Sequence, residues 1–310
     1  MAGAPFERGS VSIRLYPHDD LDASGALAEL CAQARMALES GFDGLMTSEH
    51  HGGVGGYLPN PLQLAGFVLE ETVAGWAAPC PLLLPLRPTA LVAEEVAWLA
   101  ARHPGRVGLG VASGAMELDF SAMGLDVADS TAVFRAELPR IVDMLRGRDL
   151  RGLDGDRALQ ACADNPIPVL SAAVSPTAAR RAARCAAGIL LEGMSAPARL
   201  RELCAAYEDA GGTGTKVLIR RVWLGPPQPD LVARQRRFYD RAREGARPMP
   251  ADQTVTTTDP VEMAGILADL LRSTGADALN LRIHLPGMAP GAVREQISAL
   301  AADVLPRLRP

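Results

Sequence analysis

Short apolar runs alternate with helix-like segments along the whole chain, and this alternation limits the fold more than any other feature. A short apolar run bounded by turn residues is typical of a buried strand, whereas apolar residues on one stripe are typical of a helix. Strict alternation of the two indicates an α/β protein with a parallel sheet, and eight strand–helix units close into a (β/α)8 TIM barrel. The eight predicted strands are 11–16, 42–47, 77–84, 106–112, 167–173, 188–191, 216–224 and 278–283.

Three of the predicted helices begin with the same signal. Asn60-Pro61, Ser175-Pro176 and Asp259-Pro260 each place a capping side chain before a proline. The side chain accepts a free backbone N–H, and proline suits the first helical turn. A basic helix over 230–243 adds an extra segment after strand seven, whereas the polar stretch 147–165 has no period and is expected to be a surface excursion.

An open, doubly wound sheet is the main alternative to the barrel. Such a sheet places a glycine-rich turn after its first strand in order to hold a nucleotide. Here Tyr16-Pro17-His18-Asp19-Asp20 occupies that position instead. The length of 310 residues also suits one barrel domain over 1–310.

Charge and composition disfavour several classes of function. The net charge of −5 disfavours a nucleic-acid partner, because neutralising phosphates needs a basic excess. The longest apolar runs, such as 79–86, are far shorter than the roughly 20 residues of a membrane-spanning helix. Residues 1–10 lack the apolar core of a signal peptide, and the five cysteines show no metal-knuckle spacing. We therefore expect a cytoplasmic protein without membrane, nucleic-acid or metal partners.

Strand two ends in Glu49-His50-His51, at the barrel face where functional residues gather. Adjacent residues of an extended chain point to opposite sides, so Glu49 and His51 are expected to face one way and His50 the other. A carboxylate beside an imidazole can orient the ring and bring its pKa near neutrality, as general acid–base chemistry requires. The alternative is a polar cluster that only anchors the loop.

Other strand ends carry candidate ligand contacts. Cys80-Pro81 interrupts strand three, which indicates either a bulge that supports a flat ligand or an ordinary trans proline. The glycines of strand four lack dinucleotide spacing, and they favour a ligand close to the backbone. Ser175-Pro176-Thr177 and Glu192-Gly193-Met194-Ser195 lead into helices, where free N–H groups suit a phosphate or are simply capped by serine.

Four pairs of segments together resemble the luciferase-like monooxygenase family, which includes bacterial luciferase. Their order and spacing cover nearly the whole chain. The resemblance implies a TIM barrel that uses reduced FMN and O2 on a small organic substrate. The pairs are Gly41-Phe42-Asp43-Gly44-Leu45 with Ser48-Glu49-His50-His51, Leu84-Pro85 with Ala93-Glu94-Glu95-Val96, Gly105-Arg106 to Gly110 with Asp119-Phe120 and Gly124, and Asn280-Leu281-Arg282 with Val304-Leu305-Pro306-Arg307.

The resemblance also implies roles for individual residues. His50 would lie over the flavin ring as a base or hydrogen-bond partner, with Glu49 and His51 supporting it. A cis peptide at Cys80-Pro81 would back the ring, and the phosphate would lie after strands four and five. The expected cofactor contacts are Cys80, Pro81, Ala112, Ser113, Ser175, Thr177, Gly193, Met194 and Ser195.

Ser113 is where this chain departs from the family pattern. FMN-binding relatives such as luciferase have an arginine there, and a serine cannot replace its bidentate, charge-assisted contact with phosphate. Either another cation reaches the phosphate, or flavin binds weakly and transiently, which suits delivery by a separate flavin reductase. Two alternatives stay open, an F420-dependent reductase or dehydrogenase and a non-catalytic flavin-binding subunit. The resemblance further implies a homodimer.

Overall fold

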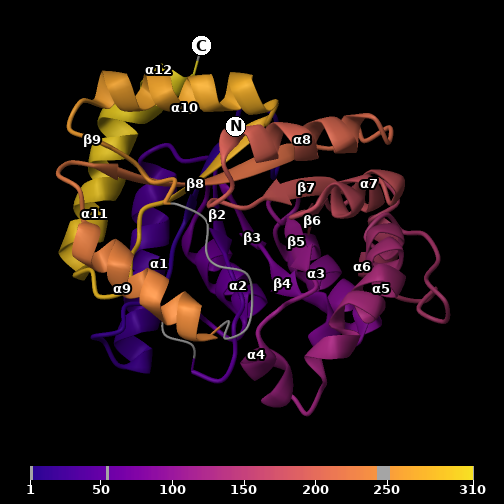
Figure 1. The fold of residues 1–310 in the computed structure, drawn as a ribbon. Helices are drawn as coiled ribbons and strands as arrows, with labels where there is room; N and C mark the ends of the chain where they lie inside the picture. The colour runs from indigo at the N-terminus through magenta and orange to yellow at the C-terminus, as the bar shows by residue number, and fades with distance from the viewer. Residues whose placement is uncertain (1–2, 54–55, 243–251, 310) are drawn as a thin grey trace.

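The computed structural model describes residues 3–53, 56–242 and 252–309, and its strands form a barrel that is surrounded by helices (Figure 1). The strands are short, and most of their residues are buried. They are β1 (Val11–Arg14), β2 (Gly44–Thr47), β3 (Trp76–Pro79), β4 (Leu82–Leu83), β5 (Leu109–Ala112), β6 (Val169–Ala172), β7 (Gly188–Leu191), β8 (Lys216–Leu224), β9 (Val255–Thr257) and β10 (Ala278–Arg282).

The helices follow the strands in the predicted alternation. Asn60, Ser175 and Asp259 cap their helices through their side chains, as expected. The helices are α1 (Ala23–Glu39), α2 (Pro61–Glu71), α3 (Thr89–Arg102), α4 (Glu117–Ser121), α5 (Ser130–Met144), α6 (Arg157–Ala161), α7 (Pro176–Arg184), α8 (Pro197–Glu208), α9 (Pro229–Ala242), α10 (Pro260–Thr274), α11 (Pro290–Ala299) and α12 (Leu305–Leu308), with the short 3-10 or π segments η1 (Leu84–Leu86), η2 (Val127–Asp129) and η3 (Leu300–Val304).

The sheet closes on itself. Its order is β3-β2-β1-β10-β8-β7-β6-β5-β4, and the neighbouring strands are parallel. β3 and β4 are the two halves of one barrel strand, separated by a cis peptide between Cys80 and Pro81. A backbone bridge from Ala77 to Val107 joins β3 to the segment before β5. The predicted (β/α)8 barrel and the predicted cis bond are therefore both confirmed.

Alternation along the strands separates two regions of the core. In β1, Val11 and Ile13 belong to the large core between sheet and helices, whereas Arg14 lies in the barrel interior. Below the functional end, the interior is filled by side chains that include Met46 and Trp76. Interiors of eight-stranded barrels are packed in this way, so space for a ligand remains only at the carboxyl ends of the strands.

Two segments between strands depart from the simple strand–helix alternation. The extra segment after strand seven is confirmed, because α9 and β9 both precede α10, and β9 pairs with β8. The prediction that 147–165 is only a surface excursion was wrong. It contains α6, and its apolar residues Leu150, Leu159 and Cys162 are buried in the core even though most of their neighbours are polar. Within the described ranges, no helix is long and apolar enough to cross a membrane.

Candidate active site

A cavity of about 390 Å³ opens at the carboxyl ends of the barrel strands. Much of its wall is apolar, with titratable side chains at several points. A cavity of this kind suits a small molecule or the ring of a cofactor. The apolar contributors include Pro81, Leu83, Ala112, Ala172, Met194 and Ile219, and the polar ones include Arg14, Tyr16, Ser48, His50, Tyr57, Glu192, Arg221, Asp252 and Arg282.

Asp119 of α4 positions His50 at the wall of this cavity. Nδ1 of His50 lies 2.8 Å from Oδ2 of Asp119, and the backbone N–H of His51 donates to Oδ1 at 2.7 Å. The Asp119 side chain is fully buried, whereas that of His50 keeps 19% of its surface exposed. Because a carboxylate only accepts hydrogen bonds, Nδ1 carries the hydrogen, and Nε2 of the neutral ring is a proton acceptor.

Glu49 and His51 form a separate buried pair. Nε2 of His51 donates to Oε1 of Glu49 at 2.9 Å. The same carboxylate accepts the backbone N–H of Leu83 at 2.6 Å and pairs with the guanidinium of Arg87. The predicted alternation is therefore observed, but Glu49 does not contact the ring of His50. It ties the end of β2 to β4, and Asp119 takes the orienting role that was expected of Glu49.

The predicted cofactor contacts divide into two groups. Pro81, Ala112, Ser113, Gly193 and Met194 line the cavity. Pro81 lies at the break between β3 and β4, and the other four lie at or shortly after the carboxyl ends of β5 and β7, where barrel enzymes gather their functional residues. These positions are brought together although they are far apart in sequence.

The remaining predicted contacts lie outside the cavity wall. Cys80 is fully buried in the barrel interior, where burial raises the pKa of its thiol to about 11. Ser175 accepts the backbone N–H of Ala178 at 3.2 Å as the cap of α7, and Thr177 is exposed in the first turn. Ser195 donates to Glu192 at 2.8 Å. These hydroxyls border the site or support it, and they do not form its wall.

Three arginines give one side of the cavity a positive character. Arg14, Arg282 and Arg221 come from β1, β10 and β8, which are neighbours in the sheet. Ser113 follows β5, which is separated from β8 by β7 and β6. Among the described residues that line the cavity, no lysine or arginine belongs to the β5 or β6 side. The cation expected beside Ser113 is therefore not supplied by the cavity wall itself.

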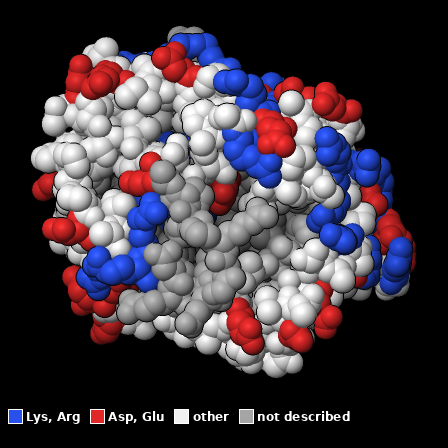
Figure 2. Space-filling model, viewed as in Figure 1, with Lys and Arg blue, Asp and Glu red and all other residues white. Residues whose placement is uncertain are grey.

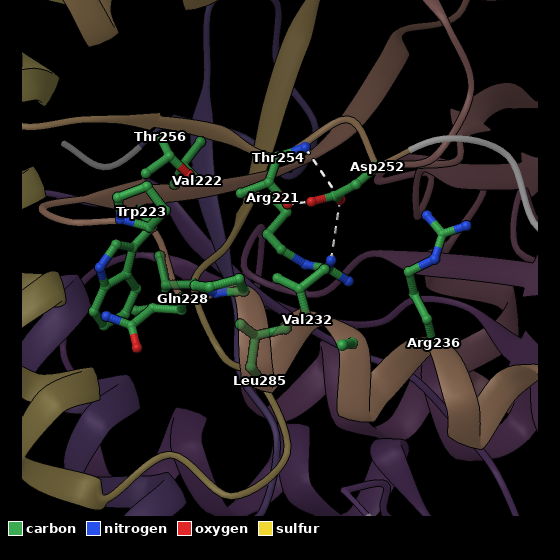
Figure 3. Close-up of a pocket in the computed structure, with 14 residues that line it drawn as sticks. Arg221, Val222, Trp223, Gln228, Val232, Arg236, Asp252, Thr254, Thr256 and Leu285 are labelled. Carbon is green, nitrogen blue, oxygen red and sulfur yellow. Dashed lines mark hydrogen bonds and ion pairs between the residues drawn. The ribbon is translucent and has the colours of Figure 1, made fainter.

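A second cavity of about 310 Å³ lies beside the first, between β8, β9 and α9 (Figure 3). Arg221 and Asp252 line both cavities, and their side chains form an ion pair at 3.4 Å. Val232 and Arg236 of α9 face this space, so the segment after strand seven contributes directly to the surroundings of the site. Basic side chains gather on this face over α9 and in the region of α7 and α8 (Figure 2).

Comparison with known proteins decides the family. The family model of luciferase-like monooxygenases matches residues 10–217, which is more than half of the chain. The chain belongs to this family. A curated relative of this luciferase-like protein is the F420-dependent glucose-6-phosphate dehydrogenase of Beutenbergia cavernae. The two are 29% identical over 268 residues, which cover 78% of this chain and 76% of the relative.

Solved structures of two kinds share the fold, both with a TM-score of 0.76. One is the oxygenating component of 3,6-diketocamphane monooxygenase from Pseudomonas putida, in complex with FMN, at 17% identity over 96% of this chain and 98% of the other. The other is an F420-dependent secondary alcohol dehydrogenase in complex with an F420–acetone adduct. It is 16% identical to this chain, and the match covers 98% of this chain and 100% of the other. This luciferase-like chain is an oxidoreductase, and its relatives differ in cofactor.

Sequence reasoning missed three residues of the luciferase-like site. Asp119 was noticed only as part of the family pattern, because nothing in the sequence connects it with His50, 69 positions away. Arg14 and Tyr16 lie in and after a strand that was interpreted simply as apolar. A signal was present there, because Ser12, Arg14 and Tyr16 alternate with Val11, Ile13 and Leu15. In a barrel, such a polar face points inward.

Proposed function

We propose that this protein is a monooxygenase that uses reduced FMN and dioxygen to oxidise a small organic substrate. The observation that carries the proposal is the His50–Asp119 pair at the wall of a largely apolar cavity. Reduced FMN, when bound, supplies the electrons that activate dioxygen. His50 would accept or donate a proton at Nε2, while Asp119 keeps the hydrogen on Nδ1 and holds the ring in place.

The cavity fits a flat ring system. Pro81, Leu83 and Met194 offer apolar contacts along its wall. Gly114 turns the chain away after β5 with a φ of +74°, and a Cβ at this position would come within 2.7 Å of Phe120. The turn brings the backbone itself to the edge of the cavity, because glycine adopts positive φ without strain. We infer that these residues would hold the isoalloxazine ring.

Arg199 is the candidate for the missing phosphate cation. It extends from α8, where one Nη pairs with Glu202 and the other donates to the backbone carbonyl of Val174 at 3.0 Å. Val174 lines the cavity and directly precedes Ser175, the cap of α7. A helix N-terminus with a nearby guanidinium favours a phosphate. We infer that Arg199, Ser113, Ser175 and Thr177 would hold the phosphate of FMN, and that this exposed rim would bind it only weakly.

An F420-dependent dehydrogenase is the second candidate. The curated relative of 29% identity uses F420 according to its name. In addition, this chain has Ser113 at the position where FMN-binding luciferases have an arginine. His50 and Asp119 would serve proton transfer in this case as well. The difference is that F420 carries hydride and does not activate dioxygen, so oxygen consumption separates the two candidates.

Anaerobic titration with oxidised FMN, reduced FMN and F420 tests the proposal. We expect reduced FMN to bind and Arg199→Ala to weaken its binding about 10–100-fold, since a hydrogen bond to a charged group contributes about 1.5–3 kcal/mol. Arg201→Ala on the same helix is the control, because Arg201 donates to Ser273 instead. Binding of F420 alone would favour the dehydrogenase, and binding of neither cofactor would refute both candidates.

We propose two partners for this function. Weak phosphate contacts suit a cofactor that a separate flavin reductase delivers, and the family resemblance implies a homodimer. Mixing the protein with a flavin reductase, NADH and a candidate substrate should give oxygenated product, and light scattering should give twice the mass of the chain. A monomeric mass would refute the homodimer.

A further inference from the structure

Tyr16 lies two residues after the end of β1 and lines the same cavity as His50. Its ring makes an edge contact with Tyr57 at 5.1 Å between centroids, and Tyr57 makes an edge contact with His50 at 4.4 Å. One ring therefore separates Tyr16 from His50. The Tyr16 residue is only 3% exposed, so a substrate can reach it only through the cavity.

Two guanidinium groups surround this phenol. The central carbon of Arg282 lies 4.4 Å from the centroid of the Tyr16 ring. The charge of the buried Arg14 also acts on the phenol. Arg14 is itself buried, and its other described partners, Asn280, Ser48 and Met46, are neutral. A buried cation among neutral partners favours an anion beside it, because its charge is otherwise poorly compensated.

The electrostatic surroundings of Tyr16 and His284 agree with this geometry. Burial alone would raise the pKa of Tyr16, but the charges of Arg282 and Arg14, with smaller contributions from Ser48, outweigh it and hold the pKa below its usual value. His284 stacks on the same ring at 5.8 Å between centroids. Burial, His18 and Arg282 lower the pKa of His284 to about 3, so His284 stays neutral and adds no charge.

We propose that Tyr16 is a second proton acceptor in the cavity, and that it takes the proton of a weakly acidic hydroxyl on the substrate. The substrate class is therefore a phenol or the enol of an enolisable ketone. This inference deepens the proposed function and rests on it for the redox step that follows. Arg14 and Arg282 are the groups that stabilise the resulting anion.

The step conserves charge within the cavity. The O–H bond of the substrate breaks, its electron pair stays on the substrate oxygen, and an O–H bond forms on the phenolate of Tyr16. The negative charge moves from one oxygen to another beside the same two guanidinium groups, so no charge has to cross the barrel wall. An aromatic or enolic anion is also more easily oxidised than its neutral parent, which suits an oxidoreductase.

The ionisation is testable without any cofactor. The chain has four tyrosines, and their ionisation is followed by ultraviolet absorbance as the pH rises. We expect one tyrosine to ionise below the usual value of about 10. Tyr16→Phe should remove this component, Arg282→Gln should move it to higher pH, and Tyr207→Phe, outside the cavity, should leave it unchanged. If all tyrosines ionise together near the usual value, the proposal is overturned.

Turnover then tests the substrate class. Phenols and enolisable ketones are offered beside the corresponding aryl methyl ethers and enol methyl ethers, with reduced FMN and oxygen or with F420. We expect the phenols and the enolisable ketones to react and the ethers to be inert. The Tyr16→Phe variant should have a kcat about 10²–10⁴-fold lower than the wild type and unchanged cofactor binding. Equal turnover of ethers, or a Tyr16→Phe variant with the wild-type kcat and pH profile, overturns the inference while the proposed function stands. Absence of cofactor binding overturns the proposed function, and the tyrosine titration is read independently of it.

Discussion

Replacing Asp119 with asparagine should invert the tautomer of His50. In the wild-type protein the carboxylate accepts from Nδ1 of His50 at 2.8 Å and from the backbone N–H of His51 at 2.7 Å. An asparagine can keep its oxygen on the His51 N–H and then presents its NH2 group to the imidazole. Nδ1 becomes the acceptor, and the hydrogen moves to Nε2. Nε2 would then lack the lone pair with which it accepts a proton.

The magnitude follows from the bonds that change. To regain the basic tautomer, the Asp119→Asn variant must leave a buried amide hydrogen without an acceptor, at about 1–3 kcal/mol. With about 1.4 kcal/mol per factor of ten, kcat should fall about 5–100-fold or more. The free energy of unfolding should change much less, because asparagine keeps one bond and replaces the other. Asp119→Ala loses both, so it should lower the free energy of unfolding by about 3–6 kcal/mol.

Nitrogen NMR of histidine-labelled protein reads the tautomer directly, without substrate or cofactor. His50 is assigned by its absence from the His50→Gln spectrum. Asp126→Asn is the matched control, because Asp126 caps the nearby segment η2 and its carboxylate accepts from Ala128 at 2.8 Å. A hydrogen that stays on Nδ1 in Asp119→Asn would contradict the expected change of tautomer. An unchanged kcat together with a switched tautomer would show that His50 is not the proton acceptor.

Two further predictions concern stability. His284 has its pKa lowered to about 3 by burial, so the unfolded chain binds a proton that the folded chain excludes between about 6.5 and 3. As the pH falls through this window, the free energy of unfolding should therefore fall by about 1.4 kcal/mol per pH unit because of His284. The His284→Phe variant should lack that part of the acid sensitivity. Parallel pH curves for the two proteins would contradict this. In β5, a Cβ on Gly110 would lie 2.1 Å from Sγ of Cys80, so Gly110→Ala should destabilise by about 1–3 kcal/mol in denaturant unfolding. Gly265→Ala, in open space on α10, should instead stabilise by about 0.5–1 kcal/mol, and equal effects of the two would refute the packing argument.

Local signals predicted the fold because each depends on near neighbours in sequence. β7 and β8 have the bounds that their apolar runs indicate, and Asn60 caps α2 as its position before a proline implies. Strand three was predicted as one run, but the backbone divides it at Cys80–Pro81. The cis bond there was expected only through the family resemblance, because base rates favour a trans proline.

The site was less predictable, because barrel closure decides which strand ends meet. His50 and Asp119 become partners only when α4 packs against the end of β2, and no periodicity reports that contact. Glu49 was expected to serve its neighbour His50, but the alternation of an extended chain turns its side chain to His51. Adjacency in sequence was therefore a poor guide to partnership, whereas the rule of alternation was a good one.

His50 and Tyr16, which both line the cavity, have partners of opposite charge. His50 has a carboxylate beside it, which keeps a hydrogen on Nδ1. Tyr16 has two guanidinium groups, which favour loss of its hydrogen. Groups whose surroundings favour opposite protonation states can divide acid and base roles between them. One of these roles depends on Asp119 and the other on Arg14 and Arg282. The Asp119→Asn and Arg282→Gln variants should therefore change different limbs of the pH–rate profile. Identical profiles for the two variants would show that a single group titrates.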